Sequence, residues 1–242
     1  MKNPSELRID VAPHGATSAI VYPAENTAPS SAGALILAHG AGAGQRSPFI
    51  TEFARAIAGL GFDVVTFNFL YAEQRRRAPD KAPVLEACYR AVISAVRGIG
   101  AAKHALFIGG KSMGGRIATQ VAAGDRGIRV AGLVSLGYPL HPPGRPQERR
   151  DAHLPSVERP MLFVQGSRDA FGTPEELAPV LARLGSTAVL HVVDGGDHSF
   201  KVSRAGAPPS PADSTRASAR QAAVYEDVQR IVAEWMVNIS GR

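Results

Sequence analysis

Two patterns of hydrophobic and polar positions follow one another along this chain. Near the N-terminus, Leu7–Val11 alternates apolar and polar side chains, which predicts a half-exposed edge strand. Thr17–Tyr22 predicts a second strand, joined to the first by a hairpin turn at His14-Gly15. From residue 34 onward, continuous apolar runs replace the alternation, and such runs are typical of strands buried on both faces.

The apolar runs of this second region are separated by segments with helical periodicity. The predicted buried strands are Ala34–Ala38, Phe62–Phe69, Leu106–Ile108, Val130–Leu136, Met161–Val164 and Ala188–Val193. The predicted helices follow Ser47 and Thr173 and span Val84–Ile99, Ile117–Ala123 and Thr215–Ile239, with long loops expected over Tyr71–Pro83 and Tyr138–Pro160. Strands that alternate with helices predict an α/β fold with a mostly parallel sheet and helices on both faces. In such sheets a ligand site lies at the C-terminal ends of the strands.

Composition narrows the class of protein. The 242 residues, 45% of them hydrophobic, suit one α/β domain over residues 1–242. No apolar run reaches the length of a membrane span, and the N-terminus has no apolar signal segment, so we expect a cytoplasmic protein without membrane partners. The net charge of +6 is scattered, which argues against a nucleic-acid partner. A single cysteine, Cys88, excludes an internal disulfide, and we expect it in the core.

The segment Gly110-Lys111-Ser112-Met113-Gly114 follows one predicted buried strand and precedes a predicted helix. Gly-x-Ser-x-Gly between a strand and a helix predicts a sharp, strained turn that exposes a serine nucleophile. The same letters match the end of a phosphate-binding loop, but that motif needs glycine where Ala105 stands. The segment could also be an ordinary Gly/Ser turn without a catalytic role, unless a base and an acid are found for Ser112.

Ser112 needs a base to take its proton and a carboxylate to orient the base. In α/β-hydrolase folds these follow the serine in the order acid, then histidine. Asp169 follows the strand Met161–Val164, and His198 follows the last strand, so these are the predicted acid and base. Asp194 and Asp197 are rival acids, but they lie close to His198 in sequence. Among the other histidines, His39 precedes Ser112, His141 and His153 precede Asp169, and His14, His104 and His191 are in or beside strands.

An oxyanion that develops during acyl transfer needs preorganised N–H donors. The residue after the nucleophile, Met113, is expected to supply one. Ala41, in the glycine-rich loop after Ala34–Ala38, is expected to supply the other, with Gly42 as an alternative.

Six segments between about residue 34 and residue 200 together resemble one protein family. They are Leu37-Ala38-His39-Gly40-Ala41-Gly42, Phe67-Asn68-Phe69, Gly110-Lys111-Ser112-Met113-Gly114-Gly115-Arg116, Gly137-Tyr138-Pro139-Leu140-His141-Pro142, Gln165-Gly166-Ser167-Arg168-Asp169 and Gly196-Asp197-His198-Ser199-Phe200. This set resembles the α/β-hydrolase-like proteins related to the testis-expressed protein and to a chromatin-complex subunit, and more distantly the dienelactone hydrolases. The resemblance implies an eight-stranded sheet with an antiparallel second strand, and the nucleophile, acid and base at Ser112, Asp169 and His198. Dienelactone hydrolases use a cysteine nucleophile, so serine here argues against that particular substrate.

The sequence therefore predicts a serine hydrolase, of carboxylesterase type, that acts on a small-molecule ester, thioester or similar acyl substrate. No metal or organic cofactor is expected, and neither is a large lid domain; the chain is expected to be a monomer or homodimer. The alternative is a non-catalytic binding or scaffold module, because the resembling group includes members without established activity. The pocket walls are expected from Gly42–Ser47, Tyr71–Arg77, Tyr138–Arg150 and Phe171. If they faced this pocket, five arginines would favour an anionic substrate: Arg46, Arg75, Arg76, Arg77 and Arg145.

Overall fold

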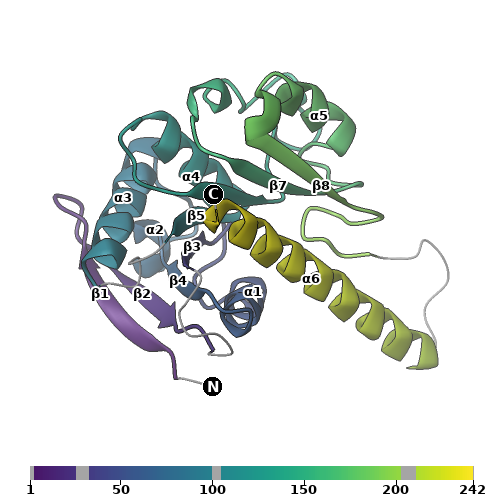
Figure 1. Ribbon diagram of the computed structural model, residues 1–242, viewed down its shortest axis with the longest axis horizontal. Helices are drawn as coiled ribbons and strands as arrows, with labels where there is room; N and C mark the ends of the chain where they lie inside the picture. The colour runs from purple at the N-terminus through teal and green to yellow at the C-terminus, as the bar shows by residue number, and fades with distance from the viewer. Residues whose placement is uncertain (1–2, 26–32, 100–104, 203–210, 242) are drawn as a thin grey trace.

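A computed structural model describes residues 3–25, 33–99, 105–202 and 211–241 of the chain. Its centre is an eight-stranded sheet in the order β1-β2-β4-β3-β5-β6-β7-β8 (Figure 1). The strands are β1 (Ser5–Asp10), β2 (Ala16–Tyr22), β3 (Ala34–Ala38), β4 (Asp63–Phe67), β5 (Leu106–Lys111), β6 (Gly132–Leu136), β7 (Met161–Gly166) and β8 (Ala188–Val193). Strand β2 runs antiparallel to both β1 and β4, and the pairs from β4 to β8 are parallel.

Helices cover both faces of the sheet, as the alternating pattern predicted. Helices α1 (Pro48–Gly59) and α6 (Pro211–Ser240) pack on one face, in a core cluster that includes Phe53 and Val232. The other face carries α2 (Leu70–Glu73), α3 (Ala82–Gly98), α4 (Met113–Ala123) and α5 (Pro174–Ala182). Short 3₁₀ turns lie at Leu154–Ser156 and Gly185–Thr187. Within the described ranges no connection inserts a large lid, so the predicted fold class is confirmed.

Several expected element boundaries differ from those of the structure. The segment Tyr71–Pro83 is not loop throughout, because α2 occupies its start and α3 its end. A four-residue helix is too short to leave a periodic pattern. Helix α6 begins at Pro211 rather than Thr215, since its first turns carry polar residues and no apolar stripe. Strand β6 begins at Gly132 rather than Val130.

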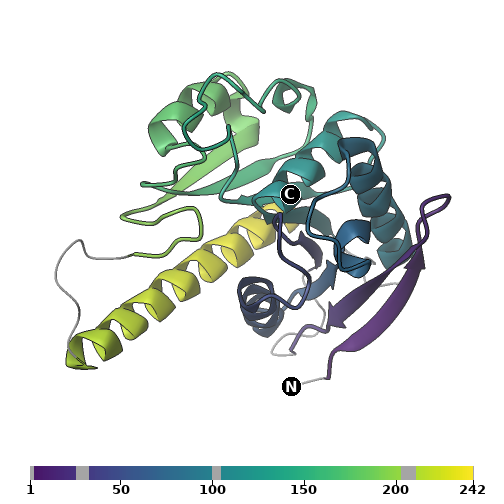
Figure 2. The ribbon, with the colours of Figure 1, turned by 180° about the vertical axis from the view of Figure 1, so that it is seen from behind.

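The buried side chains of α6, among those described, lie in its second half. Val228, Val232 and Met236 are buried, whereas residues 215–220 are exposed. Figures 1 and 2 show the N-terminal half of α6 projecting beyond the body of the molecule. Of the helices in the described residues, none combines the length and hydropathy that a membrane crossing requires. Cys88 is fully buried in the core, as expected.

Candidate active site

Ser112 lies at a strained turn between β5 and α4. Its backbone has φ 52° and ψ −117°, which is unfavourable for a residue with a side chain. The turn is tight because a Cβ on Gly110 would lie 2.4 Å from the Ala38 carbonyl oxygen, and one on Gly114 would lie 2.5 Å from it. Only glycine allows these approaches. The residues before the turn, Leu106–Ile108, form a buried strand, which excludes a phosphate-binding loop there.

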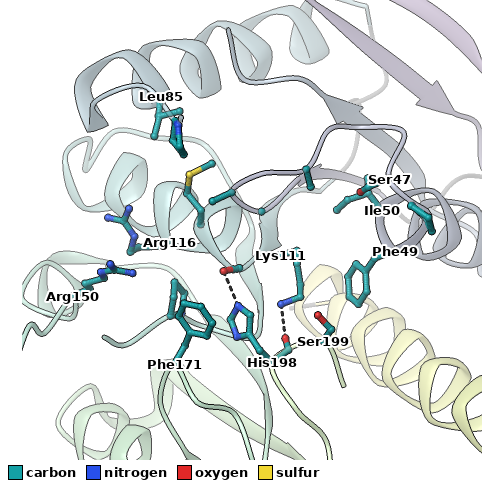
Figure 3. A pocket seen from close by; sticks show the side chains of 18 of the residues that line it. Ser47, Phe49, Ile50, Leu85, Lys111, Arg116, Arg150, Phe171, His198 and Ser199 are labelled. Atoms are coloured by element: carbon teal, nitrogen blue, oxygen red, sulfur yellow. Dashed lines mark hydrogen bonds between the residues drawn. The ribbon is translucent and has the colours of Figure 1, made fainter. Parts of the chain in front are cut away.

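The structure brings the other two predicted residues to Ser112. Asp169 follows β7 and His198 follows β8, so the three side chains meet above the C-terminal strand ends. His198 Nε2 lies 2.8 Å from Ser112 Oγ, and His198 Nδ1 lies 2.8 and 3.0 Å from the two Asp169 oxygens (Figure 3 draws the first of these contacts). Ser112 therefore has the partners that distinguish a nucleophile from an ordinary turn serine.

The bond to Asp169 fixes the tautomer of His198. A carboxylate only accepts hydrogen bonds, so Nδ1 carries the proton and Nε2 presents its lone pair to the Ser112 hydroxyl. Burial lowers the pKa of His198; the Asp169 hydrogen bond opposes this shift, and the charge of Lys111 adds to it. His198 is consequently neutral at neutral pH, the state in which it accepts a proton. The ring of Phe171 stacks on His198, with centroids 4.2 Å apart, and further restricts its orientation.

The Asp169 side chain is 1% exposed, so its carboxylate accepts hydrogen bonds from protein groups around it. The Phe171 N–H donates to its Oδ1 (2.8 Å), and Gln165 Nε2 donates to its Oδ2 (2.8 Å). Gln165 is itself fully buried, and its Oε1 accepts from the Tyr138 N–H (2.8 Å). The sequence analysis gave Gln165 no role. The signal was a polar residue inside an otherwise apolar strand, which needs a buried partner.

The two expected oxyanion donors both line the pocket beside Ser112. Met113 is the first residue of α4, where helical N–H groups lack intrahelical acceptors. Ala41 follows Gly40, whose Cβ, if present, would lie 3.4 Å from Ser112 Cβ. The loop after β3 thus lies against the nucleophile, and its Gly42 has a φ of +73°.

Two side chains that were given no chemical role hold this loop. His39 Nε2 accepts from the Phe69 N–H (3.1 Å), so its Nδ1–H donates to the Gly40 carbonyl (2.8 Å). Burial lowers the pKa of His39, which keeps it neutral in this arrangement. Asn68 Oδ1 accepts from the Gln45 N–H (2.9 Å) at the other end of the loop. Both contacts join distant segments, and no local sequence pattern reports them.

A pocket of about 740 Å³ opens over the Ser112–His198 pair. Of the expected walls, Ala43, Ser47, Pro139, Arg150 and Phe171 line it, whereas Tyr71–Arg77 does not and Pro79 and Asp80 do.

The expectation for the five arginines is wrong. None of them, although all are described, lines the pocket. Arg46 and Arg145 form ion pairs outside it, and Arg76 pairs with the pocket-lining Asp80. Two other arginines, Arg116 and Arg150, line it instead (Figure 3). Arg150 ends the expected wall Tyr138–Arg150, whereas Arg116, the last residue of the motif of residues 110–116, had been given no role at the pocket.

Lys111, next to Ser112, is 8% exposed. Its ammonium donates to the carbonyl of His198 and lies 5.8 Å from the ring centroid of Phe49 (Figure 3). Burial lowers its pKa to about 8. Lys111 therefore holds the loop that carries His198, and its ammonium does not point to solvent. Among the described residues no three His, Cys, Asp or Glu side chains gather as metal ligands would.

Comparison with known proteins places this geometry in a family. A family model described as an alpha/beta hydrolase domain matches residues 31–226. An α/β serine hydrolase without a lid from Xanthomonas campestris is 22% identical, with 95% of each chain covered and a TM-score of 0.69. An α/β serine hydrolase homologue from Coxiella burnetii is 20% identical over 94% of this chain and 98% of that one, with a TM-score of 0.68. The dienelactone hydrolase of Anabaena variabilis is 18% identical over 98% and 99%, with a TM-score of 0.70. At these identities the likeness concerns the fold.

Proposed function

This chain belongs to the α/β-hydrolase domain family, and from that premise we propose that it is a serine hydrolase that cleaves an ester, thioester or related acyl bond. One observation carries the proposal: His198 bonds the buried Asp169 through one ring nitrogen and the Ser112 hydroxyl through the other. A protein that only binds a partner has no need of this relay. The relay is the arrangement that activates a serine for acyl transfer.

The proposed reaction begins with attack of Ser112 Oγ on the acyl carbon. His198 Nε2 takes the hydroxyl proton, and Asp169 stabilises the imidazolium through Nδ1–H. The C–O or C–S bond then breaks, and His198 returns the proton to the leaving group. A water molecule, deprotonated by the same histidine, attacks the acyl-enzyme and releases the acid.

We assign the oxyanion hole to the backbone N–H groups of Met113 and Ala41. Two features support this assignment: Met113 is at the N-terminus of α4, and the loop of Ala41 lies against Ser112. The helix N-terminus adds a favourable electrostatic potential at the developing negative charge. His39 and Asn68 are positioning residues in this proposal, since they act on the loop and not on the substrate.

Several finer points are part of the proposal. The activity is carboxylesterase-like on a small-molecule acyl substrate, without nucleic acid or membrane as partner. The chain is a cytoplasmic single-domain protein, monomeric or homodimeric, and it falls in the group related to the testis-expressed protein and a chromatin-complex subunit. The motif of residues 110–116 supports this placement.

A fluorophosphonate probe and p-nitrophenyl acetate test the proposal on the full chain. We expect the wild-type protein to be labelled and to release p-nitrophenol, and Ser112→Ala to lose both activities. Ser47→Ala is the matched control, because Ser47 lines the same pocket without a basic partner at its hydroxyl among the described contacts. Asp169→Asn is expected to lower turnover strongly, and an unchanged rate would move the acid role to another carboxylate. If the wild-type protein is neither labelled nor active, the protein is the non-catalytic module instead. Labelling and turnover that survive in Ser112→Ala would refute Ser112 as the nucleophile.

A further inference from the structure

Two guanidinium groups face the pocket from one side of the Ser112–His198 hydrogen bond. Arg116 comes from α4, and Arg150 from the loop between β6 and β7. Figure 3 shows them next to each other, while Phe49 and Ile50 lie on the opposite side of the Ser112–His198 pair. The pocket therefore has a basic end and an apolar end, with the nucleophile between them.

Backbone contacts fix both arginines relative to the nucleophile. The Arg116 N–H donates to the Ser112 carbonyl (3.1 Å), so the two residues are one helical turn, or about 6 Å along the axis, apart. The Arg150 N–H donates to the Leu140 carbonyl (2.9 Å), and its own carbonyl accepts from the Tyr138 hydroxyl (2.7 Å). The positions of the two side chains are thus set by a helix and by a loop anchored at a buried tyrosine.

Neither Arg116 nor Arg150 is part of an ion pair in the described ranges of the chain. Neighbouring arginines are paired, Arg145 with Glu148 (2.9 Å) and Arg149 with Asp151 (3.1 Å). Within the described part of the chain no carboxylate pairs with Arg116 or Arg150. Arg116 has one side-chain hydrogen bond, from Nη1 to Gln120 (3.3 Å), and its Nε is buried without an acceptor. Like charges held together with an unpaired buried donor are unfavourable unless an anion joins them.

The remaining charged groups of the pocket do not supply that anion. Asp80 is paired with Arg76 (2.6 Å), and Glu52 is on α1, the helix that carries Phe49 and Ile50 at the apolar end. Lys111 and Lys201 are further cations that line the pocket. The lining therefore carries more positive than negative charge, which attracts an anionic substrate.

We propose that Arg116 and Arg150 form an anion-binding subsite that selects acyl substrates carrying a carboxylate or phosphate group a few atoms from the reacting carbonyl. This inference rests on the proposed hydrolase function and names its substrate class. Guanidinium groups bind both oxyacids through paired N–H donors, so the geometry fits either. The scissile carbonyl would lie at Ser112 while the anion occupies the basic end, which leaves the apolar end for the other part of the substrate.

Hydrolysis of matched esters tests the subsite. Monoethyl succinate, glutarate and adipate are each compared with the neutral ethyl ester of the same chain length, and ethyl 4-phosphonobutanoate provides the phosphate-like arm. We expect kcat/KM to be about tenfold or more higher for an anionic ester than for its neutral analogue. The neutral ester would leave the two guanidinium groups unpaired, and a polar site rejects such an analogue. The preferred chain length measures the distance from Ser112 to the arginines, and the preferred arm identifies the oxyacid.

Arginine variants assign the preference to these side chains. Arg116→Met and Arg150→Met keep most of the side-chain volume and should each lower the anionic-to-neutral ratio about tenfold. Arg145→Met, which removes an ion-paired arginine outside the pocket, should leave the ratio unchanged. Equal turnover of anionic and neutral esters by a Ser112-dependent wild-type enzyme would overturn the subsite while the hydrolase proposal stands.

A binding measurement decides the same question without catalysis. In the Ser112→Ala protein, sodium glutarate or inorganic phosphate should raise the unfolding midpoint above that in sodium chloride of equal ionic strength. The increase should vanish when Arg150→Met is added. An increase that survives in the double variant, or none at all in Ser112→Ala, refutes the subsite even if no ester is hydrolysed.

Discussion

Replacement of Lys111 by methionine is expected to move the acid limb of the pH–rate profile. A Cβ on Gly137 would lie 3.0 Å from Lys111 Nζ and 3.3 Å from His198 Nδ1, so these two nitrogens are at most about 6 Å apart. At that separation and an effective dielectric constant of about 20, two unit charges repel by about 3 kcal/mol. Screening by water at the open pocket reduces this value.

The direction of the shift follows from the charge. The ammonium of Lys111 disfavours the imidazolium form and so lowers the pKa of His198. Methionine removes this repulsion, the pKa of His198 rises, and a smaller fraction of the enzyme has a neutral base at low pH. We expect the acid limb of kcat/KM, which reports the free enzyme, to move to higher pH.

The assay is kcat/KM for an uncharged ester between pH 4.5 and 8, measured on the wild-type protein, Lys111→Met and Lys81→Met. Lys81 is an exposed lysine outside the pocket, so its variant should follow the wild-type profile. Lys111 stays charged over most of this range because its pKa is about 8. An acid limb that does not move in Lys111→Met, or that moves to lower pH, would refute the electrostatic role of Lys111.

Two further substitutions test the supports of the site. Gln165→Leu should lower the free energy of unfolding by about 3 kcal/mol in urea titrations, and it should also lower kcat. The substitution removes a donor to Asp169 and leaves the buried Tyr138 N–H without an acceptor. A variant as stable and active as the wild type would contradict this role. Gly114→Ala should lower the unfolding midpoint and abolish activity, since its Cβ would lie 2.5 Å from a backbone oxygen. Gly98→Ala is the control, because its Cβ would meet nothing within 4 Å, and it should change neither the unfolding midpoint nor the activity. The same midpoint and activity in both glycine variants would argue against a crowded turn at Ser112.

The strands and the order of the site residues could be predicted because each has a local sequence signal. The run Ala34–Ala38 is apolar throughout, and it forms a strand buried on both faces. The elbow at Ser112 carries glycines at the two positions where a Cβ would collide with Ala38. Asp169 and His198 each follow a strand, and they come after Ser112 in the order that this fold uses, acid before histidine. That order was enough to predict that the three side chains meet at one site.

The supports of the site and the lining of the pocket could not be predicted in the same way. His39 bonds Phe69 and Gln165 bonds Tyr138, and both contacts cross between strands that are distant in sequence. Arg116 and Arg150 lie in different elements, so only the packing of α4 against the loop after β6 brings them together. The run Arg75–Arg77, which was considered for the pocket, is exposed instead, because runs of like charge are usually solvated.

The most direct test of the central claim is the location of the acyl group during turnover. The wild-type protein is mixed with p-nitrophenyl acetate, quenched in acid within the first turnovers, digested and mapped by fragment-ion mass spectrometry. The proposed mechanism predicts one acetyl group on Ser112, absent from His198→Ala. An acetyl group on Lys111 alone, or no covalent adduct while p-nitrophenol is released, would contradict it.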